Sequence, residues 1–190
     1  MQFIPCLDPL DQPRGTADFS LTPEDYGAFL CALFDEWYRD WEQGAYVSVR
    51  AFDDYVHLAM GQPCGTCAAS GRCGTYLVVE GDGSLFPCDF FCTDPWKLGN
   101  LHDIESLDDV FRLQKERRFV NESLEKPFEC ADCSWRSMCR GGCKRDWYTD
   151  EAGADHNYYC GTYRKFFAWA MPRLERIARA ELARRHQRWL

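Results

Sequence analysis

The sequence contains no long apolar run and no excess of basic residues. No stretch approaches the ~20 apolar residues that a membrane-spanning helix needs, and the N-terminus lacks the charged and apolar regions of a signal peptide. The formal net charge of -8 argues against a general nucleic-acid surface, because phosphate binding draws on clustered Lys and Arg. The small basic run Arg184, Arg185 and Arg188 fits a solvated helix end. We therefore expect a cytoplasmic protein without nucleic-acid or membrane partners.

Internal repeats and low-complexity linkers are also absent, whereas cysteine is abundant. The 190 residues are enough to bury one substantial core, and 7 Trp, 9 Tyr and 13 Phe favour a folded chain. The unusual feature is the 12 cysteines. In a reducing compartment clustered thiols usually hold metal, because structural disulfides are seldom stable there. The composition therefore predicts a folded protein that binds metal through cysteine.

Helical spacing of apolar residues predicts four helices, over residues 22–43, 47–60, 106–118 and 162–185. Thr22 can cap the first helix, since a threonine side chain accepts a hydrogen bond from the backbone of the first turn. Pro172 lies inside the last helix and is expected to kink it or split it in two.

Strand signals are fewer and shorter. Residues 75–80 and 84–88 are β-prone and flank Gly81-Asp82-Gly83, which predicts a hairpin because glycine readily adopts positive φ. Residues 1–5 are predicted to form one short apolar strand. With the helices and two cysteine-rich loops, these elements predict an α+β fold.

The cysteines fall into two blocks. The later block reads Cys130-x2-Cys133-x5-Cys139-x3-Cys143, followed by Cys160. Two thiolates separated by two residues can face one ion or cluster from a single turn, while backbone N–H groups of that turn point toward the sulfurs. This block therefore predicts a metal centre.

The earlier block comprises Cys64, Cys67, Cys73, Cys88 and Cys92, and Cys73-x9-Gly-x4-Cys88 brackets the predicted hairpin. Spacing alone does not choose between Cys64 and Cys67 as a ligand. It also leaves open a non-catalytic zinc module, since four-cysteine sites with Cys-x2-Cys spacing hold structural zinc. A secreted disulfide scaffold is a third interpretation, weakened by the missing signal peptide.

The combined pattern resembles the seven-cysteine signature of the SPASM domain, the auxiliary-cluster module of radical-SAM peptide-modifying enzymes. A closer resemblance, to the anaerobic sulfatase-maturating enzymes, rests on residues 2–7 (QFIPCL), 76–90 (YLVVEGDGSLFPCDF), 96–100 (WKLGN) and 157–160 (NYYC). It covers nearly the whole chain, but only the C-terminal half of a typical family member.

The resemblance implies two auxiliary 4Fe-4S clusters with interleaved ligands. The first would take Cys67, Cys73, Cys88 and Cys143, and the second Cys130, Cys133, Cys139 and Cys160. Cys143 would thus cross from the later block to the earlier one, which the spacing alone does not indicate. The remaining cysteines, Cys6, Cys31, Cys64 and Cys92, are expected to be ordinary thiols.

The same resemblance implies an activity. Family members cleave S-adenosylmethionine on a third 4Fe-4S cluster, and the resulting radical takes a hydrogen from the β-carbon of a sulfatase Cys or Ser. Loss of a proton and a second electron then gives formylglycine from serine, or from cysteine a thioaldehyde that water converts to formylglycine with release of hydrogen sulfide. Asp89 matches the family's proton acceptor, and a carboxylate beside the reacting group is a sensible general base. The auxiliary clusters would hold the fold together and carry the second electron, so the implied partners are a sulfatase polypeptide and an external electron donor or acceptor.

One family motif is missing: the 190 residues contain no Cys-x3-Cys-x2-Cys. S-adenosylmethionine and the third cluster are therefore expected only in an absent N-terminal half, and the chain alone is expected to be inactive. It could be a gene fragment, a truncated form or a half that works with a separate partner.

The resemblance also implies domain boundaries. Residues 1–62 would be the C-terminal remnant of a radical-SAM partial barrel with its linking helices, and residues 63–190 would form the SPASM domain with the C-terminal helices. The runner-up activity is a SPASM protein that modifies another peptide, for example by thioether crosslinking.

Overall fold

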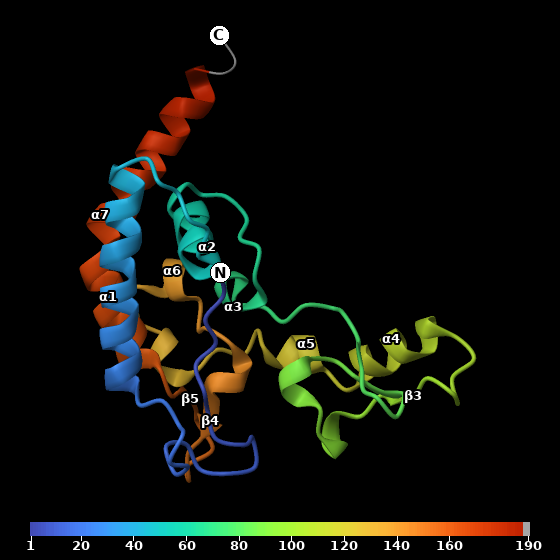
Figure 1. The fold of residues 1–190 in the computed structure, drawn as a ribbon. Helices are drawn as coiled ribbons and strands as arrows, with labels where there is room; N and C mark the ends of the chain where they lie inside the picture. The colour runs from blue at the N-terminus through green and yellow to red at the C-terminus, as the bar shows by residue number, and fades with distance from the viewer. Residues whose placement is uncertain (188–190) are drawn as a thin grey trace.

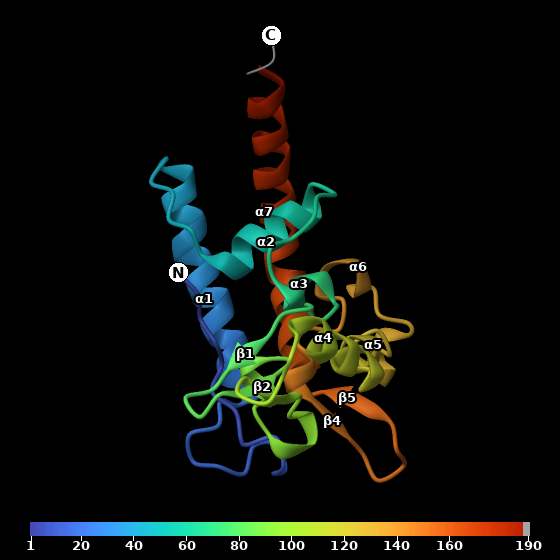
Figure 2. The same ribbon diagram turned by 90° about the vertical axis from the view of Figure 1, so that its right-hand side faces the viewer.

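The computed structural model describes residues 1–187, so Arg188 of the basic run lies outside the described residues. Three helices build the main core: α1 (Pro23–Glu42), α2 (Arg50–Ala59) and α7 (Cys160–Gln187). Helices α1 and α7 pack along each other, and α2 packs against α7 (Figures 1 and 2). The last turns of α7 extend beyond the other elements.

Aromatic side chains fill the space between these three helices. Phe34, Phe52 and Phe166, one from each helix, are fully buried. Their ring centroids lie 5.2 Å apart for Phe34 and Phe52, and 5.6 Å apart for Phe34 and Phe166. Both pairs meet edge to face, the geometry that aromatic quadrupoles favour. The aromatic richness of the sequence is therefore used to join residues 23–59 to the C-terminal helix in one core.

The first helix begins as predicted and the second begins later than predicted. Thr22 caps α1, its hydroxyl accepting a hydrogen bond from the Asp25 N–H at 3.1 Å. The pattern at 47–60 predicted a helix from Val47, but α2 starts at Arg50. The Val47 carbonyl instead accepts a hydrogen bond from the Trp37 indole at 2.7 Å, and Val49 is extended. A valine in extended conformation at this site agrees with its stiff, β-branched side chain.

Pro172 does not split the last helix, because α7 runs unbroken from Cys160 to Gln187. A proline removes the hydrogen bond to the carbonyl four residues earlier. Here that carbonyl belongs to Ala168, and both Ala168 and Pro172 are exposed, so water can replace the missing donor. Of the two expected effects of Pro172, a kink or a split, the split is therefore wrong.

Two small antiparallel sheets complete the fold. Strands β1 (Val78–Val79), β2 (Ser84–Phe86) and β3 (Gly99–Asn100) form one, with Val79 opposite Leu85 and Leu85 opposite Gly99. The predicted hairpin is thus confirmed, with shorter strands. The second sheet pairs β4 (Trp147–Thr149) with β5 (Asp155–Asn157) and was not predicted.

The strand expected over residues 1–5 is absent from the structure. Backbone hydrogen bonds join Met1 to Ser48 and Arg50, but residues 2–5 have no paired strand beside them in the described chain. A strand exists only through such pairing, so the apolar sequence of this segment is not sufficient.

Short helices and turns carry the rest of the chain. They are α3 (Cys67–Ser70), η1 (Asp89–Phe91), η2 (Asp94–Trp96), α4 (Leu107–Glu116), α5 (Phe119–Glu122), η3 (Phe128–Cys130), α6 (Arg136–Cys139) and η4 (Lys144–Asp146). The three-stranded sheet, α4 and α5 lie to one side of the large helices (Figure 1). The fold is α+β, as predicted. Within residues 1–187, no helix is long and apolar enough to cross a membrane.

Candidate metal centres

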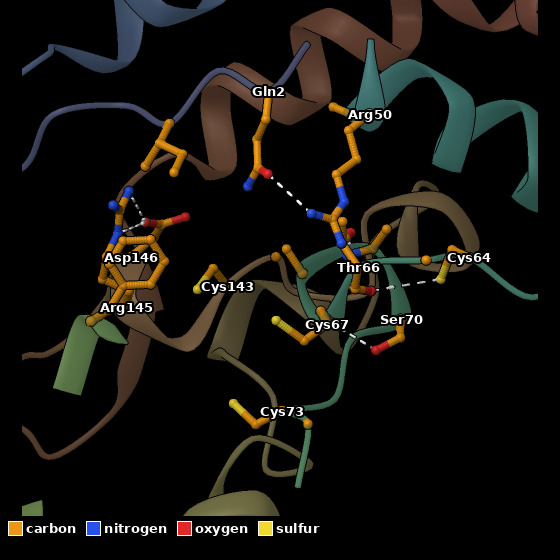
Figure 3. Close-up of a pocket in the computed structure, with 18 of the residues that line it drawn as sticks. Gln2, Arg50, Cys64, Thr66, Cys67, Ser70, Cys73, Cys143, Arg145 and Asp146 are labelled. Carbon is orange, nitrogen blue, oxygen red and sulfur yellow. Dashed lines mark hydrogen bonds and ion pairs between the residues drawn. The ribbon is translucent and has the colours of Figure 1, made fainter. Parts of the chain in front are cut away.

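Four predicted ligands line one cavity. Cys67, Cys73 and Cys143 of the first predicted set, together with Cys139 of the second, line a space of about 1050 Å³ between the large helices and the β1–β2 hairpin. Figure 3 shows the sulfurs of Cys67, Cys73 and Cys143 facing this space from three separate segments. This volume is slightly above the range of typical ligand pockets, roughly 300–1,000 Å³. The structure therefore brings Cys143 to the earlier cysteine block.

Asp54 positions Cys67. This buried carboxylate accepts hydrogen bonds from the Gly65 and Thr66 N–H groups at 2.5 and 3.1 Å and from the Thr66 hydroxyl at 2.5 Å. Thr66 in turn caps α3, accepting from the Ala69 N–H at 3.2 Å. Because these bonds fix the start of α3, they fix Cys67, its first residue.

Cys64 also lines the cavity, but its thiol faces the Thr66 carbonyl 3.9 Å away (Figure 3). Cys92 lies beside Cys88, with its thiol 3.6 Å from the Cys88 carbonyl. Both thiols are therefore directed at backbone oxygens, and their place outside the ligand sets stays a prediction.

Cys88 and Asp89 follow directly on β2. Cys88 is buried, and its sulfur lies 3.5 Å from the Tyr76 hydroxyl and 3.3 Å from an Asp89 carboxylate oxygen. Burial raises the pKa of the Cys88 thiol to about 11. Asp89 is exposed and lines the same cavity as Cys67, Cys73 and Cys143. The carboxylate predicted as a proton acceptor is thus open to a substrate and adjacent to the thiol group.

The other four predicted ligands meet at a second place. Cys130 ends η3, Cys139 ends α6, Cys160 begins α7, and Cys133 lies in the connecting turn. The pKa of Cys139 is raised to about 12, chiefly by burial and in smaller part by the nearby thiols of Cys130, Cys160 and Cys133. Burial and the Glu129 carboxylate raise the pKa of Cys160, and the thiols of Cys130 and Cys133 add to this rise. These four sulfurs therefore share one environment.

The turn from Cys139 to Cys143 connects the two predicted ligand sets. Arg140 adopts positive φ, 54°, and so do Gly141 and Gly142, at 89° and 65°. The Gly141 carbonyl accepts hydrogen bonds from the Trp147 indole and the Asn157 amide, both at 2.8 Å. This left-handed turn changes the direction of the chain between the two cysteines, which both line the cavity, so their division between two clusters stays a prediction.

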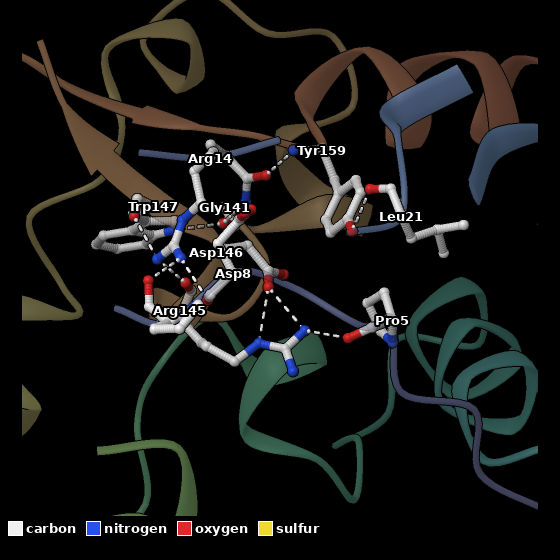
Figure 4. A network of polar contacts seen from close by, with 11 residues as sticks. Pro5, Asp8, Arg14, Leu21, Gly141, Arg145, Asp146, Trp147 and Tyr159 are labelled. Carbon is white, nitrogen blue, oxygen red and sulfur yellow. Dashed lines mark hydrogen bonds and ion pairs between the residues drawn. The ribbon is translucent and has the colours of Figure 1, made fainter. Parts of the chain in front are cut away.

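A buried polar network holds the segment after Cys143 (Figure 4). The Arg145 guanidinium binds the Asp146 carboxylate at 3.1 Å and the Pro5 carbonyl at 3.1 Å. Arg14 donates to the Arg145 carbonyl at 2.9 Å. Burial raises the pKa of Asp146, and the Arg145 charge opposes that rise. The N-terminal segment and the ligand-bearing turn are therefore tied together by paired charges.

The donor set fits iron–sulfur clusters better than single ions. Within residues 1–187, no three His, Cys, Asp or Glu side chains are close enough to hold one metal ion. A structural zinc ion contacts each sulfur directly, at about 2.3 Å. A 4Fe-4S cluster places iron and sulfide between its cysteines, so the same number of thiolates can stand further apart. The twelve cysteines are all free thiols, which gives no support to a disulfide scaffold.

Three residues that position these groups were not identified from the sequence: Asp54, Tyr76 and Lys126. Tyr76 lies in the run 76–90 that supports the family resemblance, but its contact with Cys88 depends on the hairpin register. Asp54 had a weak signal, as an acidic residue on the buried face of a predicted helix. Lys126 had none, since nothing in the sequence places it near the Cys67–Cys73 loop.

Comparisons with known proteins show which families the chain is similar to. The model of the SPASM iron–sulfur cluster-binding domain matches residues 67–134. A cysteine-type anaerobic sulfatase-maturating enzyme of Clostridium perfringens (strain 13) is 41% identical over 179 residues, 94% of this chain and 48% of the relative. A serine-type enzyme of Bacteroides thetaiotaomicron is 30% identical over 162 residues, 84% of this chain and 38% of the relative.

The solved structure of native anSMEcpe with bound AdoMet and Kp18Cys peptide is also similar, with a TM-score of 0.85 and 40% identity. The match covers 94% of this chain and 49% of that chain. The chain therefore spans about half the length of the relatives that it matches. The resemblance predicted from the sequence is confirmed: residues 67–134 match the SPASM iron–sulfur cluster-binding domain, and the chain is similar, along nearly all of its own length, to the anaerobic sulfatase-maturating enzymes.

Proposed function

We propose that this chain is the C-terminal portion of a cytoplasmic anaerobic sulfatase maturase, which oxidises a sulfatase Cys or Ser to formylglycine. The observation that supports this most is the cavity shared by Cys67, Cys73 and Cys143, which Asp89 also lines. The cavity places cysteine thiols that can hold a cluster beside an exposed carboxylate, and the reaction needs both an electron acceptor and a proton acceptor.

Two auxiliary 4Fe-4S clusters would be held by these thiols, the first by Cys67, Cys73, Cys88 and Cys143 and the second by Cys130, Cys133, Cys139 and Cys160. When bound, the clusters would supply a path for the second electron of the oxidation. Four cysteines for each cluster leave no iron free for the substrate. The chain's own part in the reaction is then to position the clusters, bind the sulfatase polypeptide and accept a proton.

Asp89 would accept that proton from the substrate thiol or hydroxyl. Its carboxylate is exposed, so a polypeptide can reach it, and it is one residue from Cys88. Hydrogen-atom removal from the β-carbon is assigned to S-adenosylmethionine and a third cluster outside these 190 residues, because they contain no Cys-x3-Cys-x2-Cys. The chain alone would bind clusters but not turn over.

Iron and acid-labile sulfide analysis after anaerobic reconstitution tests the cluster assignment. We expect about eight irons and eight sulfides for each chain, in a brown protein. A colourless protein that binds zinc instead would establish the non-catalytic zinc module and overturn the proposal.

The role of Asp89 is tested in a polypeptide that joins this chain to a half containing Cys-x3-Cys-x2-Cys. Asp89→Asn removes the proton acceptor at nearly constant volume, so most turnover on a sulfatase peptide should be lost while iron content stays the same. Asp103→Asn, in an exposed turn, is the control. An unchanged rate in D89N would exclude the role, and turnover only on peptides unrelated to sulfatases would favour the other SPASM activities.

A further inference from the structure

Lys126 connects the two cysteine groups. It lies between α5 and η3, and its half-buried ammonium donates hydrogen bonds to the backbone carbonyls of Gly71 and Ser123, the latter at 2.5 Å. These two carbonyls use two of the three N–H donors that a lysine offers. The ammonium is therefore fixed in place and is not a freely moving surface charge.

Both carbonyls belong to the support of the first group. Gly71 lies in the loop between Cys67 and Cys73. The Ser123 hydroxyl accepts a hydrogen bond from the Cys73 N–H at 2.9 Å. Lys126 thus holds the backbone that positions two of the thiols around the cavity.

The same side chain contacts the second group's support. A Cβ atom added to Gly141 would lie 3.1 Å from the Lys126 Cδ, and the ammonium lies 5.5 Å from the centroid of the Trp147 ring. Gly141 lies in the turn that leads from Cys139 to Cys143. Four residues after Lys126 the chain reaches Cys130, so the lysine is close to both groups in space and to one in sequence.

The Lys126 ammonium lies near both groups of cysteines. The carbonyls that hold the ammonium belong to Gly71 and to Ser123, whose hydroxyl binds the Cys73 N–H, and Cys130 follows Lys126 by four residues. The neighbouring acids do not neutralise it, because Glu122 pairs with Lys144 and Glu125 pairs with Arg118. A half-buried positive charge without a carboxylate partner is costly unless another anion compensates for it.

We propose that Lys126 is a positioning residue that places one positive charge between the two clusters and stabilises the reduced state of both. The inference rests on the proposed function, since it requires both clusters. Each cluster gains one negative charge when it accepts one electron, so a fixed cation nearby favours the reduced form and raises the reduction potential. Lys126 would thereby help both clusters to accept the electron released during substrate oxidation.

The test compares reconstituted wild-type chain with Lys126→Met, Lys126→Arg and Lys115→Met in redox titrations monitored by electron paramagnetic resonance. K126M keeps the aliphatic side chain and removes the charge, so both midpoint potentials should shift to more negative values at unchanged iron content. K126R keeps the charge and should stay near wild type. K115M removes an exposed lysine on α4 and should change neither potential.

Unchanged potentials in K126M would overturn the inference, and so would a shift of one cluster only, or a shift in K126R as large as in K126M. Should K126M lose iron, Lys126→Gln replaces it, because glutamine keeps N–H donors for the carbonyls and still removes the charge. Wild-type chain without iron would instead refute the proposed function, which separates the two failures.

Discussion

The Tyr76 hydroxyl donates a hydrogen bond to the sulfur of Cys88, 3.5 Å away across the β1–β2 hairpin. Tyr76 precedes β1 and Cys88 follows β2, and the pairing of Val78 with Phe86 brings them together. A hydrogen bond to a ligand sulfur stabilises the reduced, more negative cluster. If Cys88 binds the first cluster as proposed, the hairpin supplies both a ligand and a hydrogen-bond donor to the ligand sulfur.

Tyr76→Phe tests this contact. The variant keeps the ring and removes the hydroxyl, so the first cluster should stay bound but be reduced at a more negative potential, with the second cluster unchanged. Tyr46→Phe, which removes an exposed hydroxyl bonded to Asp53, is the control. Equal potentials in Y76F and wild type would show that this hydrogen bond does not reach the cluster.

Gly71→Ala tests the contact between the two ligand loops. Gly71 has φ of 66°, and an added Cβ would lie 2.6 Å from the Arg140 Cβ and 2.7 Å from the Arg140 carbonyl oxygen. The left-handed conformation costs a non-glycine residue about 1–2 kcal/mol, and the backbone clash adds to that cost. We expect G71A to lower the free energy of unfolding, measured by urea denaturation of the reduced apo chain, by more than 2 kcal/mol.

Gly61→Ala is the matched control, because Gly61 has nearly the same φ, 68°, with nothing within 4 Å of the added Cβ. G61A should lower the free energy of unfolding by only about 1–2 kcal/mol. If the two variants lose equal stability, the loops do not pack against each other as the structure has them.

The contacts of His156 predict that the stability of the chain depends on pH. Its two ring nitrogens contact Glu129 at 2.6 Å and Asp150 at 3.0 Å, and these hydrogen bonds raise the pKa of His156 above its usual value. The folded state therefore binds this proton more tightly than the unfolded state. The stabilisation should be complete below about pH 6.5 and should be lost as the pH rises through the raised pKa.

Urea denaturation of the reduced apo chain across this pH range checks the sign. The difference in unfolding free energy between wild type and His156→Gln should shrink as the pH rises, whereas His102→Gln, at an exposed position, should show no such trend. A difference that grows with pH would contradict the assigned cause.

Local signals in the sequence were sufficient where a short segment determines its own structure. Thr22 caps α1 through its own first turn, and Gly83 adopts φ of 82° in the predicted hairpin. The ligand set of Cys143 could not be predicted from a local signal. The spacing gave no reason to separate Cys143 from Cys139, and only the family resemblance did so. In the structure three residues of positive φ turn the chain between the two cysteines, and the cluster that each one binds stays a prediction.

Long-range contacts account for most of what could not be predicted. Strand β3 has only two residues and exists because Leu85 pairs with Gly99. The late start of α2 depends on the Trp37 indole, and the continuity of α7 depends on the exposure of Ala168 beside Pro172. Each of these features depends on a contact with a distant residue or with solvent, and the spacing of apolar residues along the chain does not indicate such contacts.

The most direct test of the account is which cluster is lost when single cysteines are removed. Cys67→Ala, Cys143→Ala and Cys139→Ala are reconstituted anaerobically and compared by iron content and electron paramagnetic resonance. We predict that C67A and C143A each lose the same cluster and about half of the iron, and that C139A loses the other cluster. If C143A instead loses the cluster that C139A loses, the interleaved assignment is contradicted.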